Sequence, residues 1–193
     1  MPMHHRGPPL LLRNPVERFS GLDWSPDGER IAFISGPASI STVTVRTGEA
    51  QELFRAPEGY VRYINWSPDG GRISFNHYQA PVGKARLMVA PVDGGEPQAV
   101  VTEPPPREML SHSWAPHGRA ITYALYDPAR DRNSLWTVSI PDGAARRLET
   151  GHENSISPCW SRDGKGLAFA AASQSLPGRK QFWVMENFQT RRE

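Results

Sequence analysis

The chain has 193 residues, of which 38% are hydrophobic and 22% charged, so it can bury one substantial core. Its 22 basic and 20 acidic residues leave a formal net charge of +2. This charge is too small for the strong positive field of a typical nucleic-acid-binding protein, and we expect no nucleic-acid partner. No apolar run approaches the length of a membrane span, and the three leucines at 10–12 are too few for a signal-peptide core. The sequence therefore predicts no membrane span and no export signal.

One five-residue stretch occurs four times along the chain. Trp-Ser-Pro-Asp-Gly stands unchanged at 24–28 and 66–70, and diverged copies stand at 114–118 and 160–164. The four tryptophans, Trp24, Trp66, Trp114 and Trp160, follow one another at intervals of 42, 48 and 46 residues. A period of this length, with a turn signal and several short apolar runs in each repeat, is typical of a β-propeller blade. The sequence thus predicts an all-β propeller of four-stranded antiparallel blades.

Each copy of the stretch predicts a hairpin turn followed by a strand. Proline fixes φ in the turn, aspartate accepts local backbone hydrogen bonds, and glycine adopts the positive φ that a residue with a Cβ resists. Apolar residues follow at constant offsets of seven and nine from each tryptophan, as at Ile31 and Phe33, and residues two apart share one face of a strand. The structural turn residues are Pro26, Asp27, Gly28, Pro68, Asp69, Gly70, Gly118, Asp163 and Gly164.

The predicted strands can be given in chain order. After an inner strand that ends at Trp24, the first repeat has strands at 30–34, 42–46 and 51–54. The second has strands at 61–66, 72–76, 86–90 and 98–101, and the third at 111–114, 120–125, 135–139 and 146–149. The fourth has strands at 156–160, 166–170 and 182–185. The blades cover about 19–54, 60–101, 109–149 and 155–188, within a propeller at 10–188 that lies between a disordered tail at 1–9 and a polar tail at 189–193.

The fourth repeat has no outer strand of its own, and residues 10–13 stand where such a strand precedes the other tryptophans. We expect this N-terminal strand to complete the last blade, because a completed blade leaves no open sheet edge. Three arrangements satisfy the pattern. The chain closes on itself as four blades, two chains form a homodimer by sharing these strands, or the chain is a piece of a larger propeller with an open arc.

The repeats resemble the TolB-type, WD-like propeller repeat. Arg-Ile-Ala-Phe at 30–33 and Gln-Phe-Trp-Val-Met at 181–185 match its second and third elements, and the resemblance covers about residues 10–188. The same repeat occurs in the propellers of prolyl oligopeptidase-family peptidases. The resemblance implies a ring of six blades in general. It also implies a periplasmic location if the chain is truncated from a TolB-like precursor, whereas the chain as given would be cytoplasmic.

A binding surface is predicted on the face that carries the loops between the second and third strands of each blade and the connections between blades. Irregular loops on a rigid scaffold are where proteins usually bind their partners. Several of these loops are basic, and the alternative is that their charges are merely solvated. The candidate binding residues are Lys84, Arg130, Arg132, His152 and Arg179.

The sequence contains no recognisable catalytic or metal-binding motif. There is no Gly-x-Ser-x-Gly nucleophile elbow and no glycine-rich phosphate loop. His77, His112 and His152 share no common offset from their tryptophans and no metal-ligand spacing, so we expect no metal and no cofactor. We expect His112 to be hydrogen-bonded and half-buried beside Trp114, and the single cysteine, Cys159, to be a small buried hydrophobe.

Two functions of different class remain open. The first is a non-enzymatic scaffold that binds a protein or peptide partner. The second is the substrate-gating propeller of a prolyl oligopeptidase-like serine peptidase that lacks its hydrolase domain.

Overall fold

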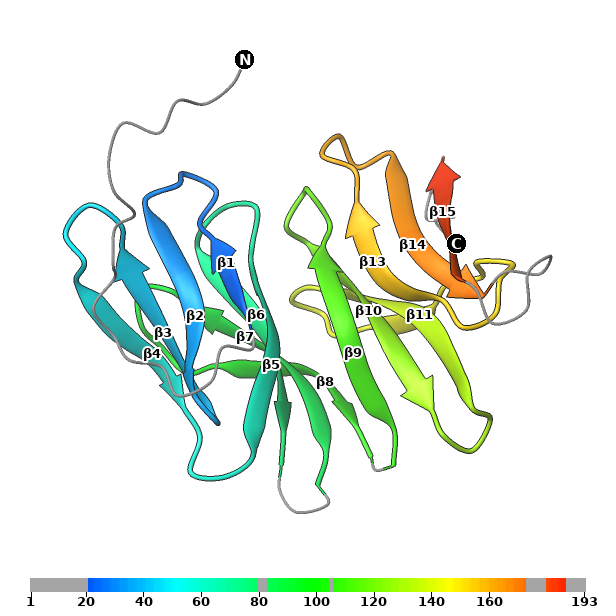
Figure 1. Cartoon of the computed structure of the whole chain (residues 1–193), viewed down its shortest axis with the longest axis horizontal. Helices are drawn as coiled ribbons and strands as arrows, with labels where there is room; N and C mark the ends of the chain where they lie inside the picture. The colour runs from blue at the N-terminus through cyan, green and yellow to red at the C-terminus, as the bar shows by residue number, and fades with distance from the viewer. Residues whose placement is uncertain (1–20, 80–82, 105, 173–179, 187–193) are drawn as a thin grey trace.

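Figure 1 shows the computed structural model of the chain, which describes residues 21–79, 83–104, 106–172 and 180–186. Fifteen strands occur in these residues. No helix is found among them, and so none that could cross a membrane. The strands form four antiparallel sheets that follow one another around an arc (Figure 1). The predicted all-β fold of antiparallel blades is confirmed.

Each of the first three blades is a four-stranded antiparallel meander. The first contains β1 (Leu22–Trp24), β2 (Arg30–Gly36), β3 (Ser39–Thr44) and β4 (Ala50–Arg55). The second contains β5 (Tyr60–Trp66), β6 (Arg72–Tyr78), β7 (Ala85–Pro91) and β8 (Gln98–Glu103). The third contains β9 (Glu108–Trp114), β10 (Ala120–Asp127), β11 (Arg132–Ser139) and β12 (Ala145–Arg147).

The fourth blade has three described strands, β13 (Ile156–Trp160), β14 (Gly166–Ala172) and β15 (Lys180–Glu186). The outer strand predicted at 10–13 and the tails predicted at 1–9 and 189–193 lie outside the described residues. The first strand of each blade ends at the tryptophan of its repeat, and β1, β5, β9 and β13 contact one another in succession along the inner side of the arc (Figure 1).

The turn after Trp24, Trp66 and Trp160 is held by its own serine and aspartate. In the first copy the backbone N–H of Arg30 donates to Ser25 Oγ at 2.8 Å, and that of Glu29 donates to Asp27 Oδ1 at 2.9 Å. Gly28 has φ = 74°, the left-handed conformation that the turn requires. The hydroxyl of Ser25 also donates to the Asp27 carboxylate, and this hydrogen bond is the main reason why the pKa of Asp27 is lowered.

The third copy of the turn has alanine and histidine where the others have serine and aspartate. His117 Nδ1 accepts the backbone N–H of Arg119 at 3.0 Å, so the imidazole takes the role of the aspartate. The N–H of Gly118 donates to the carbonyl of Ala115 at 2.8 Å, and Gly118 has φ = 69°. The turn geometry is therefore retained although its polar side chains have changed.

Two strands end two residues earlier than predicted. β3 was expected at 42–46 but ends at Thr44, because the N–H of Thr44 bonds to the carbonyl of Glu49 at 2.9 Å and already closes the hairpin. β12 was expected at 146–149 but ends at Arg147. The next residue, Leu148, is only 4% exposed and packs between the third and fourth blades.

The hydrophobic core consists of three clusters, each of which joins two neighbouring blades. Each blade turns one surface toward the preceding blade, which we call its incoming face, and one toward the following blade, which we call its outgoing face. On the incoming face of the second blade lie Trp66, Ile73 and Phe75, and on its outgoing face lie Leu87 and Val89; all are at most 6% exposed. The protein therefore has a separate small core between each pair of neighbouring blades instead of one central core.

Buried hydrogen bonds also join the blades. Ser74 Oγ and His112 Nε2 are 2.8 Å apart across the second and third blades, and the indole N–H of Trp160 donates to Thr122 Oγ1 at 3.1 Å across the third and fourth. His112 is hydrogen-bonded as expected, but it is buried rather than half-buried, being 4% exposed. Burial lowers the pKa of His112 to about 4.

Cys159 is exposed, so the prediction that it is a small buried hydrophobe was wrong. It pairs with Ala168, which in turn pairs with Val184, so all three belong to the outgoing face of the last blade. The equivalent residue of the first blade, Asp23, reaches across to the second blade with its carboxylate. Cys159 lies where no further blade follows among the described residues.

Candidate functional site

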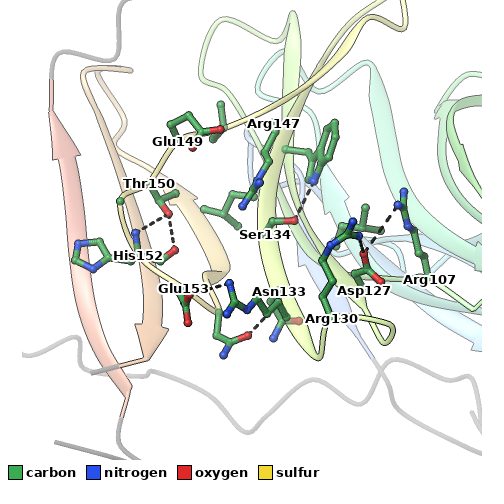
Figure 2. Close-up of a pocket in the computed structure, with 17 residues that line it drawn as sticks. Arg107, Asp127, Arg130, Asn133, Ser134, Arg147, Glu149, Thr150, His152 and Glu153 are labelled. Carbon is green, nitrogen blue, oxygen red and sulfur yellow. Dashed lines mark hydrogen bonds and ion pairs between the residues drawn. The ribbon is translucent and has the colours of Figure 1, made fainter. Parts of the chain in front are cut away.

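A pocket of about 620 Å³ lies beside the third blade, against the chain that connects it to the fourth (Figure 2). Its walls are the β10–β11 hairpin, the strand β11 and the connection from β12 to β13, and Arg107 from the β8–β9 connection lies at its edge. We call it the connection pocket. It lies on the face of the propeller where the sequence places the irregular loops.

The connection from β12 to β13 is fastened to the third blade at two adjacent points. Arg132 forms an ion pair with Glu153 at 2.8 Å between Nη1 and Oε1, and the backbone N–H of Asn133 donates to Asn154 Oδ1 at 3.0 Å. Both charged side chains are more than half exposed, so the ion pair contributes roughly 0.2–1 kcal/mol. Its main effect is to fix where the connection crosses the pocket wall.

On the opposite side of the pocket, Asp127 forms ion pairs with two arginines. Arg130 Nη1 is 2.6 Å from Asp127 Oδ2, and Arg107 Nη2 is 4.0 Å from the same oxygen (Figure 2). The hydrogen bond from Arg130 is the main cause of the lowered pKa of Asp127, so this carboxylate is ionised at neutral pH. Arg130 and Arg132 thus already have acidic partners within the pocket.

Two polar groups of the pocket have no such partner in the described part of the chain. Arg147 forms no ion pair there, and Figure 2 shows its guanidinium beside Ser134, over the pocket. The side-chain oxygen of Asn133 is buried and accepts no hydrogen bond from the described residues. The pocket therefore contains a cationic donor without an ion pair among the described residues, and the apolar side chains of Leu125 and Leu148 line it as well.

His152 contributes its backbone rather than its imidazole to the pocket. The Thr150 hydroxyl donates to the carbonyl of His152 at 2.9 Å and fixes this part of the connection. The imidazole is turned toward the fourth blade (Figure 2) and stacks on Trp183, with ring centroids 3.8 Å apart and an interplanar angle of 27°. His152 therefore helps to dock the connection onto the fourth blade.

The five candidate binding residues are not all brought together. Arg130, Arg132 and His152 line the connection pocket. Lys84 is exposed in the β6–β7 connection of the second blade and does not line it, and Arg179 lies outside the described residues. The sequence did not single out Arg147, because it falls in the strand predicted at 146–149, or Asn133, because only basic loop residues were selected and Asn133 is neutral. The signal that could have found Asn133 was its place in the loop predicted between the strands at 120–125 and 135–139.

The three histidines considered as metal ligands have separate partners. His77 Nε2 lies 3.1 Å from the carbonyl of Glu58, His112 contacts Ser74, and His152 stacks on Trp183. Among the described residues there is no group of three or more histidine, cysteine, aspartate or glutamate side chains placed to hold a metal ion.

Comparison with known proteins identifies the type of propeller. No protein-family model matches the chain. The TolB protein of the Tol-Pal system from Anaeromyxobacter sp. is 32% identical over 104 residues, which is 53% of this chain and 22% of TolB. The structure of a putative TolB from Agrobacterium tumefaciens superimposes with a TM-score of 0.72 and 23% identity, over 88% of this chain and 58% of that one. TolB from Acinetobacter baumannii gives the same TM-score at 15% identity, over 88% of this chain and 41% of the other.

The chain has the fold of the TolB β-propellers, and about half of it is similar in sequence to TolB. An uncharacterised protein of Agrobacterium fabrum is 25% identical over 180 residues, which is 86% of the TolB-type chain and 54% of the relative. The TolB-type chain thus spans about half the length of this relative and about a fifth of the Anaeromyxobacter TolB.

Enzymes also occur among the proteins that this TolB-type propeller resembles. An uncharacterised peptidase of Bacillus subtilis is 29% identical over 157 residues, 77% of this chain and 21% of the peptidase. The oligogalacturonate lyase of Vibrio parahaemolyticus superimposes with a TM-score of 0.69 at 11% identity, over 92% of this chain and 54% of the lyase, a likeness of fold alone.

Proposed function

We propose that this TolB-type propeller is a non-enzymatic scaffold that binds a segment of a protein partner in the connection pocket. The observation that carries the proposal is that Arg147, which has no ion pair in the described residues, lines this pocket beside apolar side chains. A peptide offers the oxygen acceptor that the guanidinium of Arg147 needs.

The pocket is suited to binding because its walls are held before a ligand arrives. The contacts from Arg132 to Glu153 and from Asn133 to Asn154 fix the connection, and the contact from Arg130 to Asp127 fixes the hairpin. A site that is already ordered loses less conformational entropy when its ligand binds.

The proposal that the chain is not an enzyme is supported by where its Ser–His contact lies. Ser74 and His112 are hydrogen-bonded, but their exposed fractions are 0% and 4%, so no substrate reaches the hydroxyl. In a catalytic Ser–His pair the histidine base must also be oriented by a third group. His112 Nδ1 has no hydrogen-bond partner among the described residues.

A second candidate is that the chain serves as the propeller of a peptidase. Its likeness to the Bacillus subtilis peptidase favours this reading. In that case the connection pocket would admit or exclude peptide substrates, and the hydrolytic residues would come from another domain.

The test is a charge reversal on the pocket with a matched reversal elsewhere. A partner is first identified by photo-crosslinking from the connection pocket, and its Kd is measured by calorimetry. We expect the double change Arg130→Glu and Arg132→Glu to raise the Kd by about 10-fold or more. The control is Arg162→Glu with Lys165→Glu, two exposed residues in and beside the turn between β13 and β14.

A Kd unchanged by the pocket variant would overturn the proposal, as would equal weakening by the control. Cleavage of a peptide library by the purified chain would contradict the non-enzymatic reading. Thermal unfolding of both variants establishes that the binding change does not come from loss of the fold.

A further inference from the structure

The third blade has a shorter outer strand than the two blades before it. β12 has three residues, whereas β4 and β8 have six each. In the first and second blades, pairing between the third strand and the outer strand extends to Ser39 and Ala85. In the third blade β12 pairs only with Trp136–Val138, so the stretch of β11 that contains Ser134 has no outer strand partner in the described part of the chain. The connection pocket borders this uncovered stretch.

Two polar side chains lie on one face of the third blade beside this stretch. Strand pairing sets Arg147 directly opposite Trp136, and residues paired in this way share a face of the sheet. Ser134 comes two residues before Trp136 in β11 and lies on the same face. Both Arg147 and Ser134 line the connection pocket, and Figure 2 shows the guanidinium beside the serine side chain. The two residues therefore present their polar groups to the same part of the pocket.

Both polar groups have protons to donate to a ligand. The indole N–H of Trp136 donates to Ser134 Oγ at 3.0 Å, so the serine oxygen is the acceptor in this bond and its own proton stays available. The guanidinium of Arg147 carries only donors and forms no ion pair with the described residues. Two donors, one of them charged, therefore converge on one place in the pocket.

The blade itself does not require an arginine at this position. Strand pairing aligns Arg147 with Glu52 in the first blade and with Ala99 in the second. Glu52 forms an ion pair with Arg55, so the first blade uses this position for a contact within its own outer strand. A position that carries an acid, a methyl group and a guanidinium in successive blades is not set by the packing of the repeat. The charge of Arg147 is therefore available for binding.

We propose that the connection pocket takes the carboxylate of an aspartate or glutamate side chain in the partner segment. The guanidinium of Arg147 donates to this carboxylate, and the hydroxyl of Ser134 donates to one of its oxygens. Hydrogen bonds between an arginine and a carboxylate are among the strongest that side chains form. The inference rests on the proposed function, and it names the chemical group that the partner brings to the pocket.

The charges around Arg147 favour a single carboxylate over a phosphate group or a run of acidic residues. The other arginines of the pocket, Arg107, Arg130 and Arg132, already form ion pairs with acidic side chains. Glu149 also lines the pocket and forms no ion pair with the described residues, so it repels any further negative charge. The pocket thus matches one acidic residue whose neighbours are neutral or basic.

A displayed library of short random peptides, joined to the display protein at both ends so that none has a free carboxyl terminus, tests the proposal on the full chain. Peptides that bind the wild type but not the double variant Arg130→Glu and Arg132→Glu are taken as pocket binders. We expect them to be enriched in aspartate or glutamate at one position. With Arg147→Glu, the selection should enrich lysine or arginine at that position instead, because the sign of the charge in the pocket is reversed.

Calorimetry on one selected peptide then assigns the contact to its residues. Arg147→Gln should raise the Kd by about 10-fold or more, and Ser134→Ala by about 3-fold or more. Replacing the acidic residue of the peptide by its amide should weaken binding as Arg147→Gln does, and the two changes together should cost little more than either alone. The matched control is Arg119→Glu, an exposed arginine in the turn before β10 of the same blade, which should leave the Kd unchanged.

The outcomes separate this inference from the proposed function. Pocket binders without an acidic preference would contradict the carboxylate site and leave the proposed function standing. The same holds for an acidic preference that Arg147→Glu does not change. A library that yields no pocket binder would contradict both.

Discussion

Asp23 is joined to Trp66 by two hydrogen bonds that cross from the first blade to the second. The backbone N–H of Trp66 donates to Asp23 Oδ2 at 2.7 Å, and its indole N–H donates to the carbonyl of Asp23 at 3.1 Å. Trp66 is 5% exposed, so neither donor has ready access to water. The side-chain carboxylate therefore satisfies a backbone group that would otherwise be buried without a partner.

Asp23→Ala should lower the free energy of unfolding by about 1–3 kcal/mol, since it leaves the N–H of Trp66 unsatisfied. Asp23→Asn keeps an acceptor oxygen at the same place and should retain most of the stability. Urea denaturation measures both variants. Equal losses in the two variants would show that the charge of Asp23, rather than its hydrogen bond, stabilises the contact.

Two tryptophans at the same repeat position should differ in their contribution to stability. Trp114 is buried against the second blade, so Trp114→Ala should cost about 3–5 kcal/mol. Trp24 is 49% exposed, and Trp24→Ala should cost about 1 kcal/mol. Thermal and urea unfolding of the two variants, at a protein concentration where the chain is monomeric, checks the difference. Similar losses would mean that Trp24 is covered in solution.

Two glycines with positive φ should respond differently to an added methyl group. Gly28 has φ = 74° and open space around its would-be Cβ, so Gly28→Ala should cost only about 1 kcal/mol of left-handed strain. A Cβ at Gly59, with φ = 90°, would lie 2.1 Å from the carbonyl oxygen of Tyr78. Gly59→Ala must therefore move the backbone and should cost about 3 kcal/mol or more. Thermal unfolding tests this difference, and the melting temperature of Gly59→Ala should be lower than that of Gly28→Ala.

Because of His112, the free energy of unfolding should decrease as the pH falls. Burial lowers its pKa from 6.5 to about 4 in the folded state. The unfolded chain therefore takes up this proton at a higher pH than the folded chain does. The contribution of His112 to stability is fully present above about pH 6.5 and is lost as the pH falls toward 4, by about 3 kcal/mol in all.

The measurement for His112 is the free energy of unfolding between pH 7 and pH 4 in urea. His112→Gln should flatten the profile, because it removes the titrating group while keeping a hydrogen-bonding side chain. His117→Asn alters an exposed turn histidine and serves as the control, with a profile parallel to that of the wild type. If His112→Gln leaves the slope unchanged, other groups cause the acid sensitivity.

The parts of the fold that depend on residues close together in the chain were predicted correctly from the sequence. The turn after each tryptophan depends on a few adjacent residues, and β13 has the bounds that the apolar alternation predicted. The end of β3 at Thr44 was missed because the hairpin closes through backbone groups that carry no side-chain signal. Cys159 was misjudged because its burial depends on a neighbouring blade rather than on its own strand.

The candidate site was predicted less completely than the fold. Loop position and charge were enough to select Arg130 and Arg132, because hairpin loops can be located from strand spacing. His152 was selected for the same reason, yet its ring stacks on Trp183, some thirty residues further along the chain. Such long-range contacts depend on how the blades pack against one another. Neither the periodicity nor the charge of the sequence predicts this packing.

The direction of packing between blades bears on how the chain folds as it is made. The second and third blades bury their tryptophans against the blade that precedes them, so the surface that receives Trp66 or Trp114 has always been synthesised first. A nascent chain can therefore add blades one at a time at the ribosome, and no finished blade waits for a later tryptophan to complete its incoming face.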